Sequence, residues 1–212
     1  MKKINTQGIP YIQPIEGSTQ WYWGTDTASG DLYEAEELFH QGHSIQKNKL
    51  IFIHYPDGTV YEPISAKEGQ YFGRPIFYRN QLVLLLVDFL QQQINIIGYE
   101  PELQHKSVLA VLPLSIAEDC YNLLLVQNPL MLTRQPNDNR FQILWPEKRE
   151  FEIGNTESLC FRIEDQLYFT AWYEDPEYHE EVIVRDVHTG EVVQRISGSL
   201  MTMPDGQNWI LE

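Results

Sequence analysis

The fold is decided by residues 80–88, NQLVLLLVD, where a polar pair leads into an unbroken apolar run from Leu82 to Val87. This run is far shorter than the roughly 20 apolar residues of a membrane span, and its length is that of a strand. Because every position is apolar, the strand must be covered on both of its faces. In an antiparallel protein, small sheets stacked face to face provide that cover.

The same phrase, a polar residue, one spacer and an apolar strand, recurs along the chain. Successive copies begin roughly 40 residues apart, which is the spacing of repeats that each form one small sheet. Self-similarity at such a period indicates a repeat architecture more strongly than any single local motif does. The further copies are residues 48–50 (NKL), 128–130 (NPL), 165–167 (DQL) and, more weakly, 205–209 (DGQNW).

Two of the repeat units can be aligned over their whole length. Segments 77–89 and 94–114 match segments 161–176 and 181–200 in their order of apolar and polar residues. The pattern resembles that of β-propeller repeat proteins over residues 43–212, although the Trp-Asp dipeptide of WD repeats is missing. The resemblance implies an all-β, propeller-like fold with four or five blades, in which the two termini share one blade and close the ring. A β-sandwich with insertions is the alternative.

The domain organisation follows from the same pattern. Residues 1–19 combine Gly and Pro with few large apolar side chains, which predicts an extended N-terminal arm. Residues 20–212 are expected to form a single propeller-like domain. Within it, the turn signals at residues 55–59 (YPDGT) and 187–191 (VHTGE) predict tight hairpins, because Gly supplies the positive φ that such turns require.

One segment departs from the all-β pattern. Asp31 and Glu34 form the capping box of a helix, and Gly42 is a natural stop. Apolar residues between them recur on one helical face, so a short helix is expected over residues 32–41. A second capping box at residues 115–118 predicts at most one short helical turn.

The composition limits the kinds of partner. The net charge of −15 argues against binding to a nucleic-acid backbone and permits a basic protein partner. The two cysteines, Cys120 and Cys160, are too few for a disulfide framework. Neither a signal peptide nor a membrane span is recognised, so a cytoplasmic protein without membrane contact is expected. The sequence leaves the oligomeric state open.

Few stretches of the sequence have the residue spacing that is typical of catalytic or metal-binding sites. Glu37 and His40 are three residues apart on the expected helix, but no second pair supplies further ligands, so neither a metal site nor a cofactor is predicted. The acidic loop at residues 173–181 lacks the spacing of a calcium loop. Asp88 follows an apolar strand, where a lone carboxylate usually bonds to nearby backbone. No nucleophile elbow, phosphate loop or dinucleotide fingerprint is present, so no catalytic residue is assigned.

Aromatic residues near two carboxylates make the best candidate for a binding site. Trp21 and Trp23 alternate along one expected strand and share a face, while Tyr22 takes the other face. Together with Asp26 and Asp31 they could stack on a sugar ring or anchor a peptide. The alternative is that the tryptophans plug the junction between the arm and the core.

Three functions are compatible with these features. The first is a non-catalytic interaction or scaffold module that binds a protein, as the repeats, the acidity and the missing catalytic motifs suggest. The second is a lectin-like carbohydrate-binding protein that uses its aromatic residues. The third is a small glycoside hydrolase with paired carboxylates, for which a repeat of this size leaves little room for catalytic loops.

Overall fold

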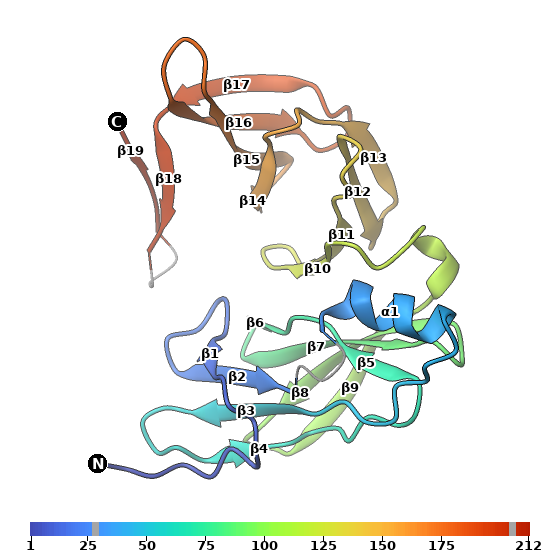
Figure 1. The fold of residues 1–212 in the computed structure, drawn as a ribbon. Helices are drawn as coiled ribbons and strands as arrows, with labels where there is room; N and C mark the ends of the chain where they lie inside the picture. The colour runs from blue at the N-terminus through green and yellow to red at the C-terminus, as the bar shows by residue number, and fades with distance from the viewer. Residues whose placement is uncertain (27–29, 204–206) are drawn as a thin grey trace. The chain divides into compact units, whose positions relative to one another are not determined.

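The computed structural model describes residues 1–26, 30–203 and 207–212. The chain divides into two compact units, Met1–Leu125 and Val126–Glu212 (Figure 1). Both units are built from antiparallel strands, as the sequence predicts. The described helices are α1 (Leu32–His40) and the single 3₁₀ turn η1 (Leu114–Ile116).

The first unit contains two sheets. The first sheet has the order β1 (Gln13–Pro14), β2 (Trp21–Thr25), β3 (Leu50–His54) and β4 (Val60–Tyr61). The second has the order β5 (Gln70–Phe72), β7 (Gln81–Asp88), β8 (Gln93–Glu100) and β9 (His105–Pro113). A further strand, β6 (Ile76–Tyr78), shares with β5 the same edge of β7.

Strand β7 is covered on both faces, as its apolar sequence requires. On one face Leu82, Leu84 and Leu86 pack into the main core of the first unit. On the other face the alternate side chains are fully buried as well. At about 25 cal/mol per Å² of buried apolar surface, this strand contributes strongly to the stability of the unit.

Helix α1 begins at the predicted capping box. The Asp31 carboxylate accepts from the Glu34 N–H at 2.9 Å, and the Glu34 carboxylate accepts from the Asp31 N–H at 3.2 Å. The helix lies beside β5, and the ring of Phe39 stacks on that of Phe89 at 5.4 Å. It ends one residue before the expected end. The single short helical turn expected near the second capping box is present as η1, which starts at Leu114 and has no side-chain cap.

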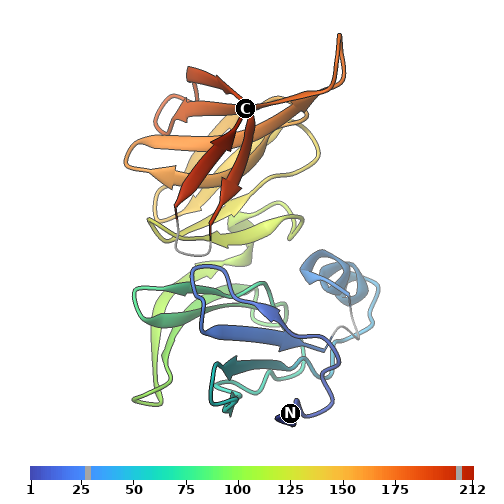
Figure 2. The same ribbon diagram turned by 90° about the vertical axis from the view of Figure 1, so that its left-hand side faces the viewer.

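The second unit also consists of antiparallel strands that follow one another in the chain. Strand β10 (Leu123–Val126) spans the boundary between the units and precedes β11 (Met131–Arg134), β12 (Arg140–Trp145) and β13 (Arg149–Glu152) in one sheet. The next sheet contains β14 (Ser158–Ile163), β15 (Gln166–Tyr173), β16 (His179–Asp186) and β17 (Val192–Ser197). The hairpin of β18 (Ser199–Thr202) and β19 (Asn208–Leu211) lies against β16 and is drawn red in Figure 2.

The repeated phrase marks a turn before an inner strand. It precedes β7, β11 and β15, each of which is the second strand in the order of its sheet. Asn80 and Asn128 adopt φ of 64° and 57° in these turns, a region that Asn tolerates better than most residues. The first copy instead precedes β3, the third strand of its sheet. In the last copy, residues 205–206 lie outside the described residues, and Asn208 begins β19.

These four sheets confirm the all-β, propeller-type repeat, and their number agrees with the smaller of the two expected blade counts. The expectation that both ends share one blade stays a prediction. In the part of the chain that the structure describes, β1 pairs with β2 and β19 pairs with β18.

The N-terminal arm is integrated into the first unit. Ile9 and Ile15 are buried in two of its apolar clusters, and the arm also supplies β1. None of the described helices has the length and hydrophobicity of a membrane span.

Candidate ligand-binding site

A cavity of about 280 Å³ lies in the first unit. Its aromatic surface comes from Trp23 on β2 and from Tyr71 and Phe72 on β5. The segment that begins α1 forms another wall with Asp31 and Tyr33. The remaining described lining residues are Gln13, Thr25, Gly30, Leu32, Gly73, Arg74, Cys120, Asn122, Leu123 and Leu124.

Strand β2 places its two tryptophans on the predicted common face, and this face is the core face. Trp21 packs against the rings of His54 and Tyr61 at centroid distances of 4.7 and 5.5 Å. This packing favours the alternative interpretation, in which the tryptophan fills the junction between the arm and the core. Ile15 of the arm belongs to the same cluster. Trp23 lies in this cluster too, but its side chain also borders the cavity.

The indole N–H of Trp23 has an unusual environment. Trp23 is only 7% exposed, and among the described residues its Nε1 is the one buried side-chain nitrogen or oxygen without a hydrogen-bond partner. Leaving a buried donor unsatisfied costs about 1–3 kcal/mol. An acceptor that reached this N–H through a small movement of the indole would recover that free energy, and such sites often have a functional explanation.

Of the other predicted residues, Asp31 alone lines the cavity. Tyr22 faces the opposite side of β2 and packs on the Ile51 cluster. Asp26 accepts from the Asn48 amide at 2.9 Å and does not line the cavity. Asp31 caps α1 and does line it. The structure therefore brings together Trp23 and Asp31, and places Trp21, Tyr22 and Asp26 elsewhere.

Asn48 holds the two strands that support the cavity. Its amide bonds to Asp26 at the end of β2, and its side-chain oxygen accepts from the Phe72 N–H of β5 at 2.7 Å. The backbone N–H of Asp26 also donates to the Lys49 carbonyl at 3.1 Å. The polar residue of the first repeated phrase is thus a buried structural bridge. No sequence motif indicated that Tyr71 and Phe72 line the cavity, because they lie in a short strand without one.

The electrostatic field of the cavity is negative. The Tyr71 hydroxyl donates to the Gly30 carbonyl. Burial, together with the nearby carboxylates of Asp26, Asp31 and Glu34, raises the pKa of Tyr71 to about 12, so this phenol is neutral at physiological pH. The negative charge of Glu37 is the main reason that the pKa of Tyr33 is also raised.

Arg74 is the single basic residue in the described lining of this cavity. Its guanidinium lies 3.6 Å from the Glu16 carboxylate, which offsets its positive charge. An anionic ligand would therefore meet carboxylates without a free cation to neutralise it.

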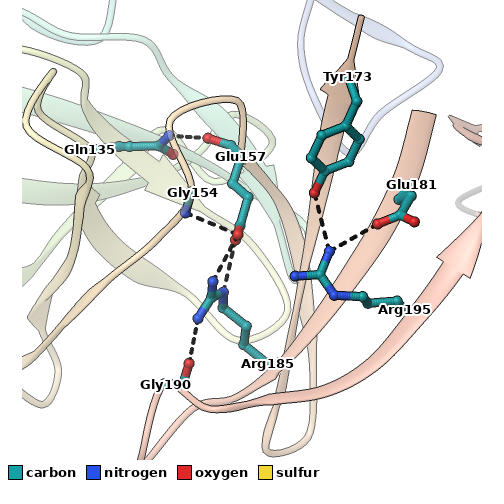
Figure 3. A network of polar contacts seen from close by, with 8 residues as sticks. All are labelled: Gln135, Gly154, Glu157, Tyr173, Glu181, Arg185, Gly190 and Arg195. Carbon is teal, nitrogen blue, oxygen red and sulfur yellow. Dashed lines mark hydrogen bonds and ion pairs between the residues drawn. The ribbon is translucent and has the colours of Figure 1, made fainter. Parts of the chain in front are cut away.

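A buried ion pair in the second unit is a further candidate for chemistry. Arg185 on β16 bonds to both carboxylate oxygens of Glu157 at 2.8 Å and to the Gly190 carbonyl at 2.7 Å (Figure 3). The Gly154 N–H donates to the same carboxylate at 3.0 Å, and the amide of Gln135 donates to the Glu157 carbonyl. These bonds occupy the carboxylate and carbonyl oxygens of Glu157. Glu157 therefore has a structural role, because it links the β13–β14 loop to the β16–β17 turn.

The other buried carboxylates are engaged as well. Glu36 accepts from the Cys120 N–H at 2.6 Å, and Asp88 accepts from the Gln91 N–H at 2.8 Å, as predicted for a carboxylate at the end of an apolar strand. A second cavity of about 300 Å³, within the second unit, does contain two carboxylates, Glu147 and Asp165. Both side chains are largely exposed and face cations, so they lack the apolar surroundings that make a carboxyl group a general acid.

The pair Glu37 and His40 gains no further ligands. Among the residues that the structure describes, no group of three or more His, Cys, Asp or Glu side chains is arranged to hold a metal ion.

Comparisons with known proteins identify no family for this chain. No protein-family model matches the chain, and no curated protein sequence is similar to it. Among solved structures, the acylaminoacyl peptidase of Pyrococcus horikoshii is similar over 96% of this chain and 35% of that chain, with 9% sequence identity and a TM-score of 0.46. The chain thus spans about a third of the length of that enzyme.

Proposed function

We propose that this protein is a non-catalytic binding module whose first unit holds a neutral, hydroxyl-rich ligand of the saccharide class. The observation that carries the proposal is the cavity whose base contains the buried residues Trp23, Tyr71 and Phe72 and whose wall, at the start of α1, contains Asp31 and the half-buried Tyr33. A small antiparallel repeat fold also suits a scaffold or a binding module.

The shape and polarity of the cavity support a sugar-sized ligand. Its volume of about 280 Å³ is close to the lower end, roughly 300 Å³, of typical ligand pockets. Among the aromatic residues of the lining, Tyr33 is only half-buried and can provide apolar surface for the C–H face of a pyranose. The side chains of Thr25 and Asp31 and the hydroxyl of Tyr33 can provide hydrogen-bonding groups for its hydroxyls. The surrounding carboxylates favour a neutral ligand over an acidic one.

The same carboxylates support a second candidate, a basic protein partner. Asp26, Asp31 and Glu34 lie close enough to Tyr71 to influence its pKa. A Lys or Arg side chain entering the cavity would be attracted by this negative field and by the aromatic rings. This candidate corresponds to the protein-binding function that the acidic composition suggests.

The test is a titration with a panel of neutral mono- and disaccharides, monitored by chemical-shift changes of the indole N–H signals. We expect Tyr33→Leu to weaken saccharide binding about tenfold, since it removes a ring and a hydroxyl from the wall. Tyr178→Leu is the matched control, because Tyr178 is an exposed tyrosine of the second unit and should leave binding unchanged. A panel without any binding would refute the saccharide proposal.

Asp31→Ser separates the two candidates. Serine is a good N-cap, so the variant should keep α1 while it removes one negative charge. Binding of a lysine-rich peptide should then weaken and become less sensitive to salt. Saccharide binding should weaken only to the extent that the serine hydroxyl is a poorer hydrogen-bond acceptor than the carboxylate, and it should stay insensitive to salt before and after the change. Failure of both the saccharides and the peptide to bind would leave the cavity without the proposed role.

Three predictions from the sequence are not tested by these observations. They are the cytoplasmic location, the single domain over residues 20–212, and the third function, a carboxylate-dependent glycoside hydrolase. Turnover of aryl glycosides by the purified protein would directly support the last of these.

A further inference from the structure

Strand β9 is an edge strand. It is the outermost strand in the order β5-β7-β8-β9, and its central residues 107–112 (SVLAVL) contain no charged side chain. Edge strands normally carry charges or are very short, because their free N–H and C=O groups invite pairing with another chain. Three other edge strands follow this rule: β1 and β4 have two residues each, and β13 reads REFE. Among the edge strands of the four larger sheets, β9 has the longest uncharged stretch in the described residues.

A bulge in β9 brings two exposed valines to the same face. Val108 is paired with Ile97 of β8, and Val111 is paired with Asn95, so the two valines face partners that are two residues apart. Leu109 is the extra residue at the shift in register. Since side chains two apart on a strand share a face, Val108 and Val111 also share one. They are 67% and 51% exposed, which is high for valine in a strand.

We propose that β9 pairs antiparallel with β9 of a second copy of this chain, about a two-fold axis between Leu109 and Ala110. In this register Val108 lies opposite Val111 of the other copy, which is a favourable cross-strand pair. The bulge makes the register possible, because it places Val108 and Val111 on one face and Ser107 and Leu112 on the other. A two-fold interface of this kind uses the same patch on both copies.

The charge of β9 permits a second copy at this edge. The chain carries a net charge of −15, which opposes close approach of two copies over most of the surface. Strand β9 contains no carboxylate, and its basic residue Lys106 would lie opposite Pro113. The proposed register therefore brings together neither two carboxylates nor two lysines. The edge is separate from the residues that line the Trp23 cavity, so this inference is independent of the proposed function.

The test is the mass of the full chain in solution, measured by sedimentation equilibrium from about 1 μM to several hundred μM. We expect the apparent mass to rise with concentration from 24.8 kDa towards twice that value. Val108→Lys combined with Val111→Lys would place lysines opposite each other twice and should weaken dimerisation at least about tenfold. Both positions are exposed, so circular dichroism should show an unchanged fold.

A charge-complementary variant tests the register itself. Val108→Lys combined with Val111→Glu puts opposite charges across the axis and should restore the dimer. The matched control is Val192→Lys with Val193→Lys on the edge strand β17, which should dimerise like the parent. A parent that stays monomeric at all concentrations, or a double-lysine variant that dimerises as well as the parent, overturns the proposal. Failure of the Lys–Glu variant to restore the dimer overturns the register.

Discussion

Breaking the Glu157–Arg185 pair should strongly destabilise the second unit. The Glu157 side chain is 4% exposed and that of Arg185 is 11% exposed, so either charge left alone would be buried without its partner. Removing one member of a buried ion pair typically costs about 3–5 kcal/mol. We therefore expect Arg185→Met and Glu157→Gln each to lower the free energy of unfolding by about that amount.

The assay is urea unfolding of the full chain, followed by circular dichroism and by tryptophan fluorescence. For a unit of this size, a loss of about 3 kcal/mol corresponds to a decrease in Tm of about 12 °C or more. The double variant Glu157→Gln with Arg185→Met should be more stable than either single variant, because it leaves no unpaired charge. The resulting coupling free energy is the quantity that a double-mutant cycle measures.

The neighbouring pair of Arg195 and Glu181 provides the control. It has a similar distance, 2.9 Å, and lies in the same sheet, but the Arg195 side chain is 52% exposed (Figure 3). Solvent screens such pairs, so Arg195→Met should cost only about 0–1 kcal/mol. Equal losses for Arg185→Met and Arg195→Met, or additive effects of the two changes at Glu157 and Arg185, would refute the argument from burial.

Three further predictions concern the first unit. Because burial raises the pKa of Tyr71 to about 12, its contribution to stability is retained below the ordinary tyrosine pKa near 10 and lost as the pH rises from about 10 to 12. Several tyrosines have a raised pKa, and tyrosinate absorbance of Tyr71→Phe should lose the group that titrates last. In Gly24→Ala the new Cβ would lie 2.6 Å from the Tyr11 carbonyl oxygen, so a loss of about 1–3 kcal/mol is expected in urea unfolding, and an unchanged midpoint would contradict the close packing of the arm. Asn48→Leu leaves the buried Phe72 N–H unpaired and should cost about 1–3 kcal/mol; rapid hydrogen exchange at Phe72 is the specific readout, and protection equal to the parent would argue against the bridge.

Local signals in the sequence predicted most of the strands and the helix. The capping box at Asp31 and the two-faced strand 82–87 act over short distances, so their consequences are set by neighbouring residues. The pairing of the terminal strands was not predictable in this way, because it depends on which sheet edges are already occupied. Alternation also showed that Trp21 and Trp23 share a face, but it does not say which face is the core.

The cavity was only partly predictable for the same reason. Trp23 and Asp31 could be selected because aromatic and acidic residues lie close together in the sequence. Tyr71 and Phe72 join them from a strand about 40 residues further along, through a register that no local pattern records. Asn48 belonged to the repeated phrase, yet its role as a bridge depends on contacts with both β2 and β5.

The bonds made by Asn48 have a consequence for how this protein can diversify. Residues 26–49 leave the first sheet after β2, carry α1, and return at β3, and their two ends are fastened together by Asn48, Asp26 and Lys49. Between these ends, Phe39 stacks on Phe89 and Glu36 accepts from the Cys120 N–H, so the buried face of α1 is fixed as well. The exposed positions of the segment can therefore change while the sheet keeps its register. Asp31 lies at such a position on the cavity wall, so substitutions confined to the exposed side of one segment can alter the cavity without disturbing its base.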